Sequence, residues 1–379
     1  MITLALRMIA FRPMRYLVAL LGIAVAAGLA FIQLGLYRGF KENASVVVDH
    51  TKGDIWVCAT GQDNFDFPNL LSMRYVEKVR EVPGVAKASP MLVVFAPWRS
   101  REGERLREGA DQTVEIIGFD PHEGTGGPWS MSSGLPEDLN LSGFVTMDTT
   151  SHKKLFGADV GSVAEINGTR VEVAGLTHGI RSFQGNPMVF CNMETARSAG
   201  HMPSDAIHYI IVELVPGADV DEVLERIRTI PFIEAYTTPQ FSFMAQDYWL
   251  TSTGAGTALA MAALLGLIVG VVVAGQVLYT STLEHLKEYG TLKAIGATNT
   301  QVAIAIMAQA LAWAIPAHLI AGGLLLLAMT QIEGKGIHLA VDARMYAILG
   351  GATIAICMSA SMLSVIRVLS VQPSDVFKG

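Results

Sequence analysis

Apolar residues are concentrated in four stretches that contain no Asp, Glu, Lys or Arg. These stretches are Tyr16–Tyr37, Tyr248–Leu283, Ala294–Ile332 and Met345–Ile366. A helix needs about 20 apolar residues to cross a hydrocarbon core of about 30 Å. The pattern therefore predicts four transmembrane helices, with apolar cores at residues 17–36, 255–278, 302–329 and 346–365.

Four crossings place both chain ends on the same side of the membrane. That side, together with the 284–301 loop, carries seven Lys and Arg residues near the spans, whereas the other side carries four. Positive charge accumulates on the cytoplasmic side of membrane proteins, so we expect cytoplasmic termini and a large external domain.

The predicted spans also contain patterns that are typical of helix packing. Gly266 and Gly270 form a GxxxG sequence in the second span, and Gly22 and Ala26 have the same spacing in the first. Small residues at this spacing let two helices approach closely. Pro316 in the third span removes a backbone donor and crowds the preceding turn, which predicts a kink.

The long segment between the first two spans contains a weak internal repeat. Residues 54–58 alternate as a strand, residues 73–82 have the period of an amphipathic helix, and a second strand follows at 91–96. Residues 208–239 repeat the order of strand, helix and strand. Two such units predict packed split β-α-β motifs, and hence an α+β lobe.

Between the two copies, residues 113–196 alternate as short strands separated by turn residues. Asn167-Gly168 lies between two alternating runs, which is a strong signal for a tight β-hairpin. We therefore expect a β-rich insertion within the α+β lobe.

The predicted fold class is an α-helical membrane protein with four transmembrane helices and a large α+β extracytoplasmic domain between the first and second. The expected boundaries are 1–16 for an amphipathic N-terminal segment, 17–37, 255–279, 302–329 and 345–366 for the helices, 38–254 for the external domain (about 42–112 and 197–245 for the lobe, 113–196 for the insertion), 280–301 for a cytoplasmic loop, 330–344 for a short external loop and 367–379 for the tail.

The charge of the long segment between the first two spans differs in sign from the charge of the rest of the chain. The whole chain has 379 residues, is 51% hydrophobic and 16% charged, and carries a net charge of −7. Residues 42–254 hold 16 basic and 29 acidic side chains, a balance of −13, whereas the remainder balances at +6. A nucleic-acid partner is not expected, because phosphate contacts need a basic face. The basic remainder is expected to lie in membrane lipid.

Isolated Cys and His residues do not form a recognisable site. Cys58, Cys191 and Cys357 are far apart in sequence, which excludes a zinc cluster, although Cys58 and Cys191 could pair in an oxidising compartment. His201 and His208 are separated by seven positions and are expected to be surface side chains. No catalytic residue, cofactor site or metal site is predicted.

Signatures of common enzymes are also missing from the sequence. No GxxxxGK[ST] is present, so this chain cannot by itself bind ATP in a P-loop, and neither HExxH nor GxSxG occurs. Enzymatic activity in this chain alone is therefore not expected.

The loop between the second and third spans carries the most informative pattern. Residues 283–298 alternate apolar and charged side chains at helical spacing and reach a glycine at Gly296. This pattern predicts a short amphipathic helix that ends at Gly296. Two interpretations remain open: a solvated connector, or an element that docks into a groove on a cytoplasmic partner, its apolar side (Leu283, Leu286, Tyr289 or Gly290, Leu292, Ile295) toward the membrane body.

This loop resembles the Glu-x-x-x-Glu-x-Gly-x-Leu-x-Ala-x-Gly-Ala signature of MacB/FtsX-type (type VII) ABC transporter permeases. The matching residues are Glu284, Glu288, Gly290, Leu292, Ala294, Gly296 and Ala297. The amphipathic start at residues 4–23 and the Pro-containing ending at residues 369–378 are also similar to the family, and the closest resemblance is to DevC-type permeases. Two departures are Tyr289, where many members carry Ile, and the absence of a fused ATPase domain ahead of the first span.

The resemblance implies a porter-like lobe, a sabre-like insertion and an inner-membrane permease with its large domain in the periplasm. It also implies an ABC ATPase subunit on a separate chain, a second permease copy (identical or not), and a periplasmic adaptor with an outer-membrane channel. The expected function is mechanotransmission that drives export or extrusion of substrate. The implied coupling residues are Glu284, Leu286, Lys287, Glu288, Tyr289, Gly290, Leu292, Lys293 and Gly296.

Two other functions stay open at this point. A lipoprotein-releasing or cell-wall-hydrolase-regulating permease of the same family would need no outer-membrane channel. A four-span membrane sensor with an extracytoplasmic ligand domain would need no ATPase partner. The transported substrate has no recognisable signature in the sequence.

Overall fold

The computed structural model describes residues 13–102, 105–180, 182, 184–332 and 339–369. Most of the predicted N-terminal segment, part of the short external loop and the last residues of the tail lie outside this description. The chain divides into two compact units. We call residues 1–39 and 255–379 the membrane unit, and residues 40–254 the α/β unit.

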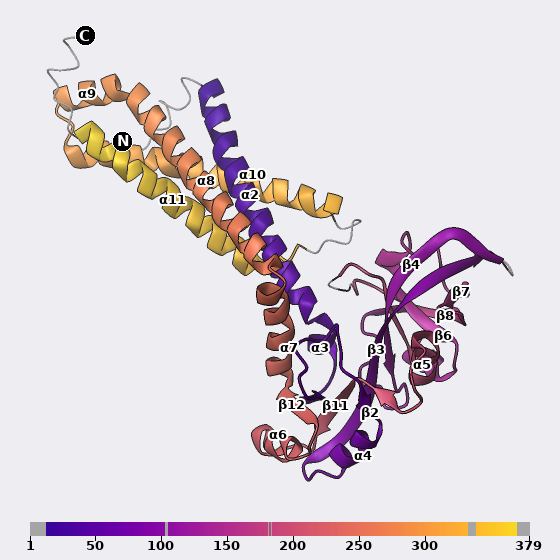
Figure 1. Cartoon of the computed structure of the whole chain (residues 1–379). Coiled ribbons are helices and arrows are strands. Elements are labelled where there is room, and N and C mark those ends of the chain that lie inside the picture. Colours follow the sequence, from indigo (N-terminus) through magenta and orange to yellow (C-terminus); the bar gives the residue numbers. More distant parts are fainter. Residues whose placement is uncertain (1–12, 103–104, 181, 183, 333–338, 370–379) are drawn as a thin grey trace. The chain divides into compact units, whose positions relative to one another are not determined.

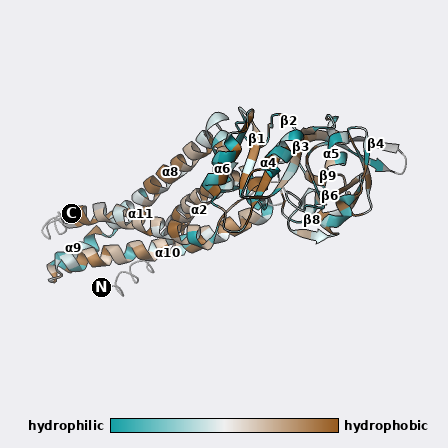
Figure 2. Ribbon diagram, turned by 90° about the horizontal axis from the view of Figure 1, so that it is seen from below, coloured by the Kyte–Doolittle hydropathy of each residue, from teal (hydrophilic) through white to brown (hydrophobic). Residues whose placement is uncertain are grey.

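The membrane unit consists of long apolar helices, which are largely brown in the hydropathy colouring of Figure 2. Its helices are α2 (Pro13–Ala44), α8 (Ala255–Glu284), α9 (Leu286–Ala294), α10 (Asn299–Ile332) and α11 (Ala343–Leu369). Among the described residues, four segments are long and apolar enough to cross a membrane: Tyr16–Ala44, Ala255–Glu284, Asn299–Gln331 and Ala343–Ile366. The four predicted spans are therefore confirmed as helices, and α2 continues to Ala44, past the expected end of the first span.

The α/β unit is built on a large mixed sheet. Its strands run in the order β12-β1-β11-β3-β4-β9-β6-β8-β5, and β7 pairs with β3 and β8. The strands are β1 (Ile55–Ala59), β3 (Val85–Glu102), β4 (Arg105–Phe119), β5 (Met131–Ser133), β6 (Phe144–Asp148), β7 (Val163–Ile166), β8 (Thr169–Thr177), β9 (Met188–Asn192), β11 (Tyr209–Leu214) and β12 (Ile233–Thr237), and a separate two-stranded sheet pairs β2 (Leu71–Ser72) with β10 (Ala206–Ile207).

The first four strands of that order form two split β-α-β motifs. Helix α4 (Arg74–Arg80) connects β1 to β3, and α6 (Val220–Arg228) connects β11 to β12. The four strands lie antiparallel in the order β12-β1-β11-β3. The strand-helix-strand repeat expected from the sequence is therefore present, and its two copies interleave within one sheet.

Strand β3 extends the sheet from these motifs into the remaining strands. Its first part, Val85–Met91, pairs with β11, and Leu92–Glu102 pairs with β4. The expected hairpin joins β7 to β8, where Asn167 and Gly168 have φ of 48° and 86°. Both residues thus adopt the positive φ that a type I′ turn requires.

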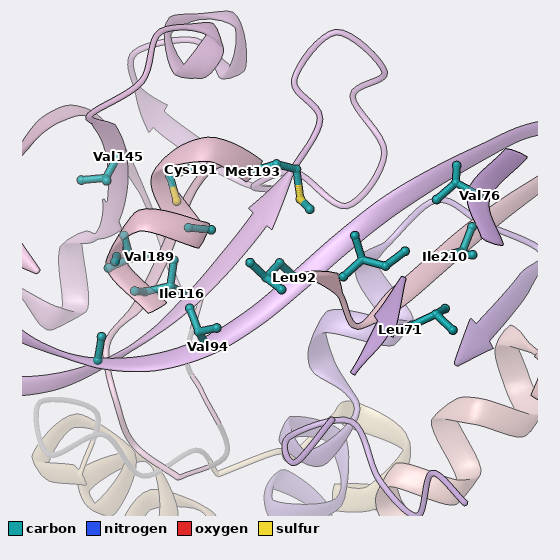
Figure 3. Packing of buried hydrophobic residues seen from close by; sticks show 14 of the residues in the cluster. Leu71, Val76, Leu92, Val94, Ile116, Val145, Val189, Cys191, Met193 and Ile210 are labelled. Carbon is teal, nitrogen blue, oxygen red and sulfur yellow. The ribbon is translucent and has the colours of Figure 1, made fainter. Parts of the chain in front are cut away.

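Helices cover both faces of this sheet. Helices α4, α5 (Met193–Gly200) and α6 contribute to one hydrophobic cluster, part of which is drawn in Figure 3 around Leu92 and Val94. Helices α3 (Val46–His50) and α7 (Thr238–Asp247) contribute to a second cluster around Trp56. Shorter turns complete the unit: η1 (Pro136–Asn140), η2 (Thr149–Ser151) and the π-turn η3 (Tyr248–Ser252). Because both faces are covered, the first four residues of β1, 55–58, are all buried.

Helix α5 was not expected from the sequence, which predicted only strands up to residue 196. Its start is capped by Asn192, whose side-chain oxygen accepts a hydrogen bond from the Thr195 amide at 2.9 Å. The alternation of the preceding strand hid this cap, because β9 runs directly into the helix.

The two chain segments that enter and leave the α/β unit lie side by side. Helices α3 and α7 pack together, and the Gln246 side-chain amide donates a hydrogen bond to the Ser45 hydroxyl at 2.8 Å. The entry and exit of this unit are thereby tied to each other.

Two expectations for isolated side chains are resolved by the fold. The prediction that His208 lies at the surface is wrong: its ring is 4% exposed, and its Nδ1 accepts a hydrogen bond from the Val93 amide at 3.1 Å. Burial lowers the pKa of His208 to about 4, so it is neutral. Cys58 and Cys191 are free thiols buried in different hydrophobic clusters, so they do not pair.

Candidate coupling site

Helix α9 is a separate short helix that lies where α8 ends and α10 begins (Figure 1). His285 interrupts the helical path between α8 and α9 with φ of −97° and ψ of 15°. At the other end, Gly296 has φ of 106°. The Gly296 amide donates to the Lys293 carbonyl and the Ala297 amide donates to the Leu292 carbonyl. This pair of bonds is a Schellman motif, so the expected termination at Gly296 is confirmed.

One face of α9 packs on the membrane unit. Tyr289 and Gly290 are buried, and Leu286 and Leu292 lie against the same cluster. The partner residues in that cluster come from α10 and α11: Val302, Ile306, Val365 and Val368. The helix is therefore held by its apolar side, as the amphipathic pattern predicts. The prediction is wrong for Leu283, which belongs to α8 and is 38% exposed.

Tyr289 provides a polar anchor within this apolar contact. Its ring is 0% exposed, and its hydroxyl donates to Oε1 of Gln309 on α10 at 2.6 Å. Burial raises the pKa of Tyr289 well above its usual value, so the hydroxyl stays protonated and remains a donor. An Ile at this position could pack but could not form this bond.

The opposite face of α9 is exposed and charged. Lys287 and Glu288 are exposed, and Lys293 is partly exposed. Glu284, the last residue of α8, is exposed as well. His285 Nδ1 lies 3.5 Å from Oε1 of Glu288. The coupling residues predicted from the sequence thus divide into a buried set and an exposed set, on α9 and on the residues that flank it.

Ile295 was expected on the apolar side, and this prediction is wrong. Its side chain is 80% exposed, because α9 ends at Ala294 and the Schellman turn directs the following residue away from the cluster. Ile295 therefore adds an exposed apolar side chain beside the charged face. It was missed because helical periodicity was extended past the last helical residue.

Small residues bring α2 and α8 together in the membrane unit. A Cβ on Gly270 would lie 3.8 Å from the Cβ of Ala26, and one on Gly22 would lie 3.6 Å from Val273 Cγ1. A Cβ on Gly266 would meet Leu29 and Gln33 at 3.8 Å. These distances are ordinary van der Waals contacts, so the small residues allow close packing.

Pro316 lies inside α10, which continues through it. A proline has no amide hydrogen, so the carbonyl four residues earlier, that of Ala312, loses its intrahelical partner. The Tyr16 hydroxyl on α2 donates to this carbonyl at 2.8 Å. Helix α2 therefore supplies the donor that α10 lacks.

A second group of functional interest was missed entirely by the sequence reasoning. Asp66 and Glu115, together with Asn43 and Met188, line a cavity of about 10 Å³ in the α/β unit, enough for about one water molecule. The Trp249 indole donates to Asp66 Oδ2 at 2.6 Å. Among the described residues, Glu115 Oε2 has no hydrogen-bond partner, although Glu115 is only 1% exposed.

Both carboxyl groups hold a proton more tightly than an exposed carboxyl group does. Burial, followed by the charge of Asp66, raises the pKa of Glu115 to about 8. Burial also raises the pKa of Asp66 to about 6, against the lowering effect of the Trp249 hydrogen bond. The signal in the sequence was a single glutamate within the apolar run Val114–Ile117. Within the described parts of the chain, no group of three or more His, Cys, Asp or Glu could hold a metal ion.

Comparison with known proteins gives matches over most of the chain. The MacB-like periplasmic core domain matches residues 16–230, and the FtsX-like permease C-terminal domain matches residues 260–373. An uncharacterized ABC transporter permease of Mycobacterium tuberculosis (strain H37Rv) is 25% identical over 385 residues, covering 100% of both chains. One from Mycobacterium bovis is 23% identical over 383 residues, with the same coverage.

Solved structures of isolated domains also match. The periplasmic region of MacB from Actinobacillus actinomycetemcomitans is 12% identical with a TM-score of 0.37, covering 52% of this chain and 94% of that one. The extracellular domain of YknZ from Gram-positive bacteria is 12% identical with a TM-score of 0.35, covering 48% and 98%.

The periplasmic core match runs through the α/β unit as far as α6, and the permease match includes α9, α10 and α11. With four spans, this is a multi-pass inner-membrane protein whose α/β unit lies in the periplasm. The chain belongs to the MacB/FtsX family of ABC transporter permeases.

Proposed function

We propose that this chain is a half-permease that pairs with a second permease copy, identical or not, and with two separate ABC ATPase subunits. ATP is hydrolysed on those subunits, and α9 is the element on which they act. The observation that carries the proposal is the two-sided character of α9, which is anchored by one face and exposed by the other.

The exposed face has the chemistry of a protein contact. Lys287 and Glu288 lie on the exposed side of α9, and Glu284 lies at the end of α8, across the break at His285. The exposed apolar Ile295 directly follows the last residue of α9. A short helix that enters a groove uses an apolar anchor for affinity and flanking charges for orientation. The inner face holds α9 on α10 and α11, so force applied to its outer face reaches those helices.

Movement of α9 is proposed to drive the periplasmic domain by mechanotransmission. The four spans contain stretches without any Asp, Glu, Lys or Arg, which disfavours a charged substrate path through the membrane unit. Helix α2 is continuous from Pro13 to Ala44 and leads directly into the α/β unit. Substrate would be expelled by the periplasmic domain without passing between the membrane helices.

The permease would also bind a periplasmic adaptor. That adaptor would lead to an outer-membrane channel, through which an exported substrate would leave. Exposed large apolar side chains on the α/β unit support a protein partner there. Phe232 is 76% exposed with φ of 68°, and Phe67 is 54% exposed. A bulky residue held at positive φ is strained, which is typical of functional positions. Co-purification of a membrane-fusion adaptor tests this part, and its absence would favour the lipoprotein-releasing or hydrolase-regulating alternative.

Substitutions on the outer face of α9 test the ATPase contact. We expect Ile295→Asp, and charge reversal by Glu284→Lys with Glu288→Lys, each to weaken binding of the ATPase subunit by about 10- to 100-fold. The measurement is the dissociation constant of the purified permease and ATPase in lipid nanodiscs, since neither change removes a side chain from the inner cluster.

Thr300→Ala is a matched control, because Thr300 is exposed at the start of α10, a few residues after Ile295. It should leave the dissociation constant unchanged. Unaltered binding by both the Ile295 and the double-charge variant would show that the ATPase does not contact α9. A wild-type chain that binds no ATPase would favour the membrane-sensor alternative.

A further inference from the structure

Two tyrosine hydroxyls connect α9 and α2 to the same turn of α10. Tyr289 on α9 donates to the Gln309 side chain at 2.6 Å, and Tyr16 on α2 donates to the Ala312 carbonyl at 2.8 Å. Three residues of an α-helix span only about 4.5 Å of rise. Both neighbours of α10 are therefore attached to it at almost the same height.

The apolar contacts follow the same division along α10. Val302 and Ile306 pack in the cluster that holds α9. Trp313 packs in the cluster that contains Leu20 and Ile23 of α2, and its ring lies 4.5 Å from that of Tyr16. One continuous side of α10 thus contacts α9 first and α2 next.

The bond from Tyr16 exists because of Pro316. In an uninterrupted helix the Ala312 carbonyl would accept the amide hydrogen of residue 316 and would not depend on a donor from another helix. In hydrocarbon an unsatisfied carbonyl is strongly unfavourable. Because Pro316 has no amide hydrogen, the Ala312 carbonyl has no donor within α10. The Tyr16 hydroxyl supplies that donor and so connects α2 to α10.

We infer that Tyr289–Gln309 and Tyr16–Ala312 form a mechanical link that passes movement of α9 through α10 to α2. This inference rests on the proposed function, since it assumes that an ATPase moves α9. Tyr16, Tyr289, Gln309 and Pro316 are positioning residues: none of them contacts the ATPase or a substrate in this scheme. Helix α2 then carries the movement to Ala44, within the α/β unit.

A pair of variants distinguishes a role of the Tyr16–Ala312 bond in passing movement from a role in folding stability alone. Tyr16→Phe alone leaves the Ala312 carbonyl without a donor, so a low yield of folded protein is expected. In Tyr16→Phe with Pro316→Ala, the amide of residue 316 satisfies that carbonyl within α10. The double variant should recover its folded yield but no longer tie α2 to α10. A purely structural role predicts that function recovers together with yield.

The assay uses the full chain in nanodiscs with the ABC ATPase subunit. A nitroxide at Lys41→Cys, an exposed position near the end of α2, reports ATP-dependent change by its EPR spectrum. The native cysteines are buried and should not be labelled. In the double variant we expect ATPase affinity within about twofold of wild type, and the ATP-dependent spectral change reduced about tenfold, as for loss of one hydrogen-bonded connection.

The second bond is tested in the same way. Tyr289→Phe with Gln309→Leu removes both polar partners and keeps the packing apolar, so stability should be retained while the spectral change falls. Tyr279→Phe on α8 is the matched control: Tyr279 is 41% exposed, and this variant should respond to ATP as wild type does.

The outcomes test the mechanical link separately from the proposed function. A double variant that binds the ATPase and still shows the full spectral change overturns the link and leaves the proposed function intact. A wild-type chain that fails to bind the ATPase overturns both. Normal binding with a lost spectral change in both double variants, and a normal response in Tyr279→Phe, is the expected result.

Discussion

Replacing Glu115 by Gln should stabilise the periplasmic domain at neutral pH and change how its stability depends on pH. Glu115 is 1% exposed, and its Oε2 has no partner among the described residues. Burial, then the charge of Asp66, raises its pKa to about 8. A carboxyl group with a raised folded-state pKa binds more protons in the folded state than in the unfolded state. Its contribution is fully present below the unfolded pKa of about 4.5 and is lost as pH rises through about 8.

The size of the effect follows from that shift. One pKa unit corresponds to about 1.4 kcal/mol, so the wild type should lose about 2–3 kcal/mol between pH 5 and pH 7 from Glu115 alone. Gln keeps the shape of the side chain but has no proton to lose. The difference in free energy of unfolding between Glu115→Gln and wild type should therefore grow by about that amount over this interval, in favour of the variant.

The measurement is a series of urea titrations of the full chain in nanodiscs at pH 5, 6, 7 and 8. Tryptophan fluorescence reports the domain, since Trp56, Trp98, Trp129 and Trp249 all lie within residues 40–254. Glu137→Gln, at an exposed position, controls for the substitution itself. Parallel stability curves for wild type and Glu115→Gln would refute the reasoning, because they would mean that Glu115 does not change protonation on unfolding.

Two further predictions concern the same unit and are measured by urea titration or thermal unfolding of the full chain. Asp148→Asn should lower the free energy of unfolding by about 2–3 kcal/mol. The reason is that the buried Asp148 carboxylate accepts a hydrogen bond from the Ile180 amide at 2.7 Å and hydrogen bonds from three other donors. A loss below about 0.5 kcal/mol would contradict this prediction. Gly84→Ala should cost about 2–4 kcal/mol, because Gly84 has φ of 100° and its Cβ would lie 2.5 Å from Val223 Cγ2. Gly217→Ala, with φ of 88° and no atom within 4 Å of the Cβ, should cost only the backbone strain of about 1 kcal/mol, and equal losses at the two glycines would exclude the steric explanation.

Features that depend on local pattern could be predicted from the sequence. The four spans follow from the absence of charge over 20 or more residues, and the hairpin follows from Asn167-Gly168. The end of α9 follows from Gly296, whose positive φ suits a residue without a Cβ. In each case the determining residues are neighbours in the chain, so periodicity and turn chemistry are sufficient.

Features that depend on distant residues could not be predicted. The Tyr16 hydroxyl and the Ala312 carbonyl are 296 positions apart, and no local pattern indicates that they meet. His208 seemed a surface residue because the strand signal did not show that both faces of the sheet are covered. Asp66 and Glu115 likewise come together only through the packing of the α/β unit, and whether α9 meets an ATPase depends on a second chain.

The hydrogen bond between Ser45 and Gln246 has a consequence for how such a protein can be altered. Because the polypeptide leaves and rejoins its helical base at adjacent points, the whole outer portion behaves topologically as a cassette. A replacement domain needs only the same short distance between its ends, and the membrane helices would not need to be redesigned. Under the proposed function, the domain that acts on the substrate and the helices that meet the ATPase are separable parts of one chain. Chimaeras joined at these two positions would show which part sets the choice of substrate.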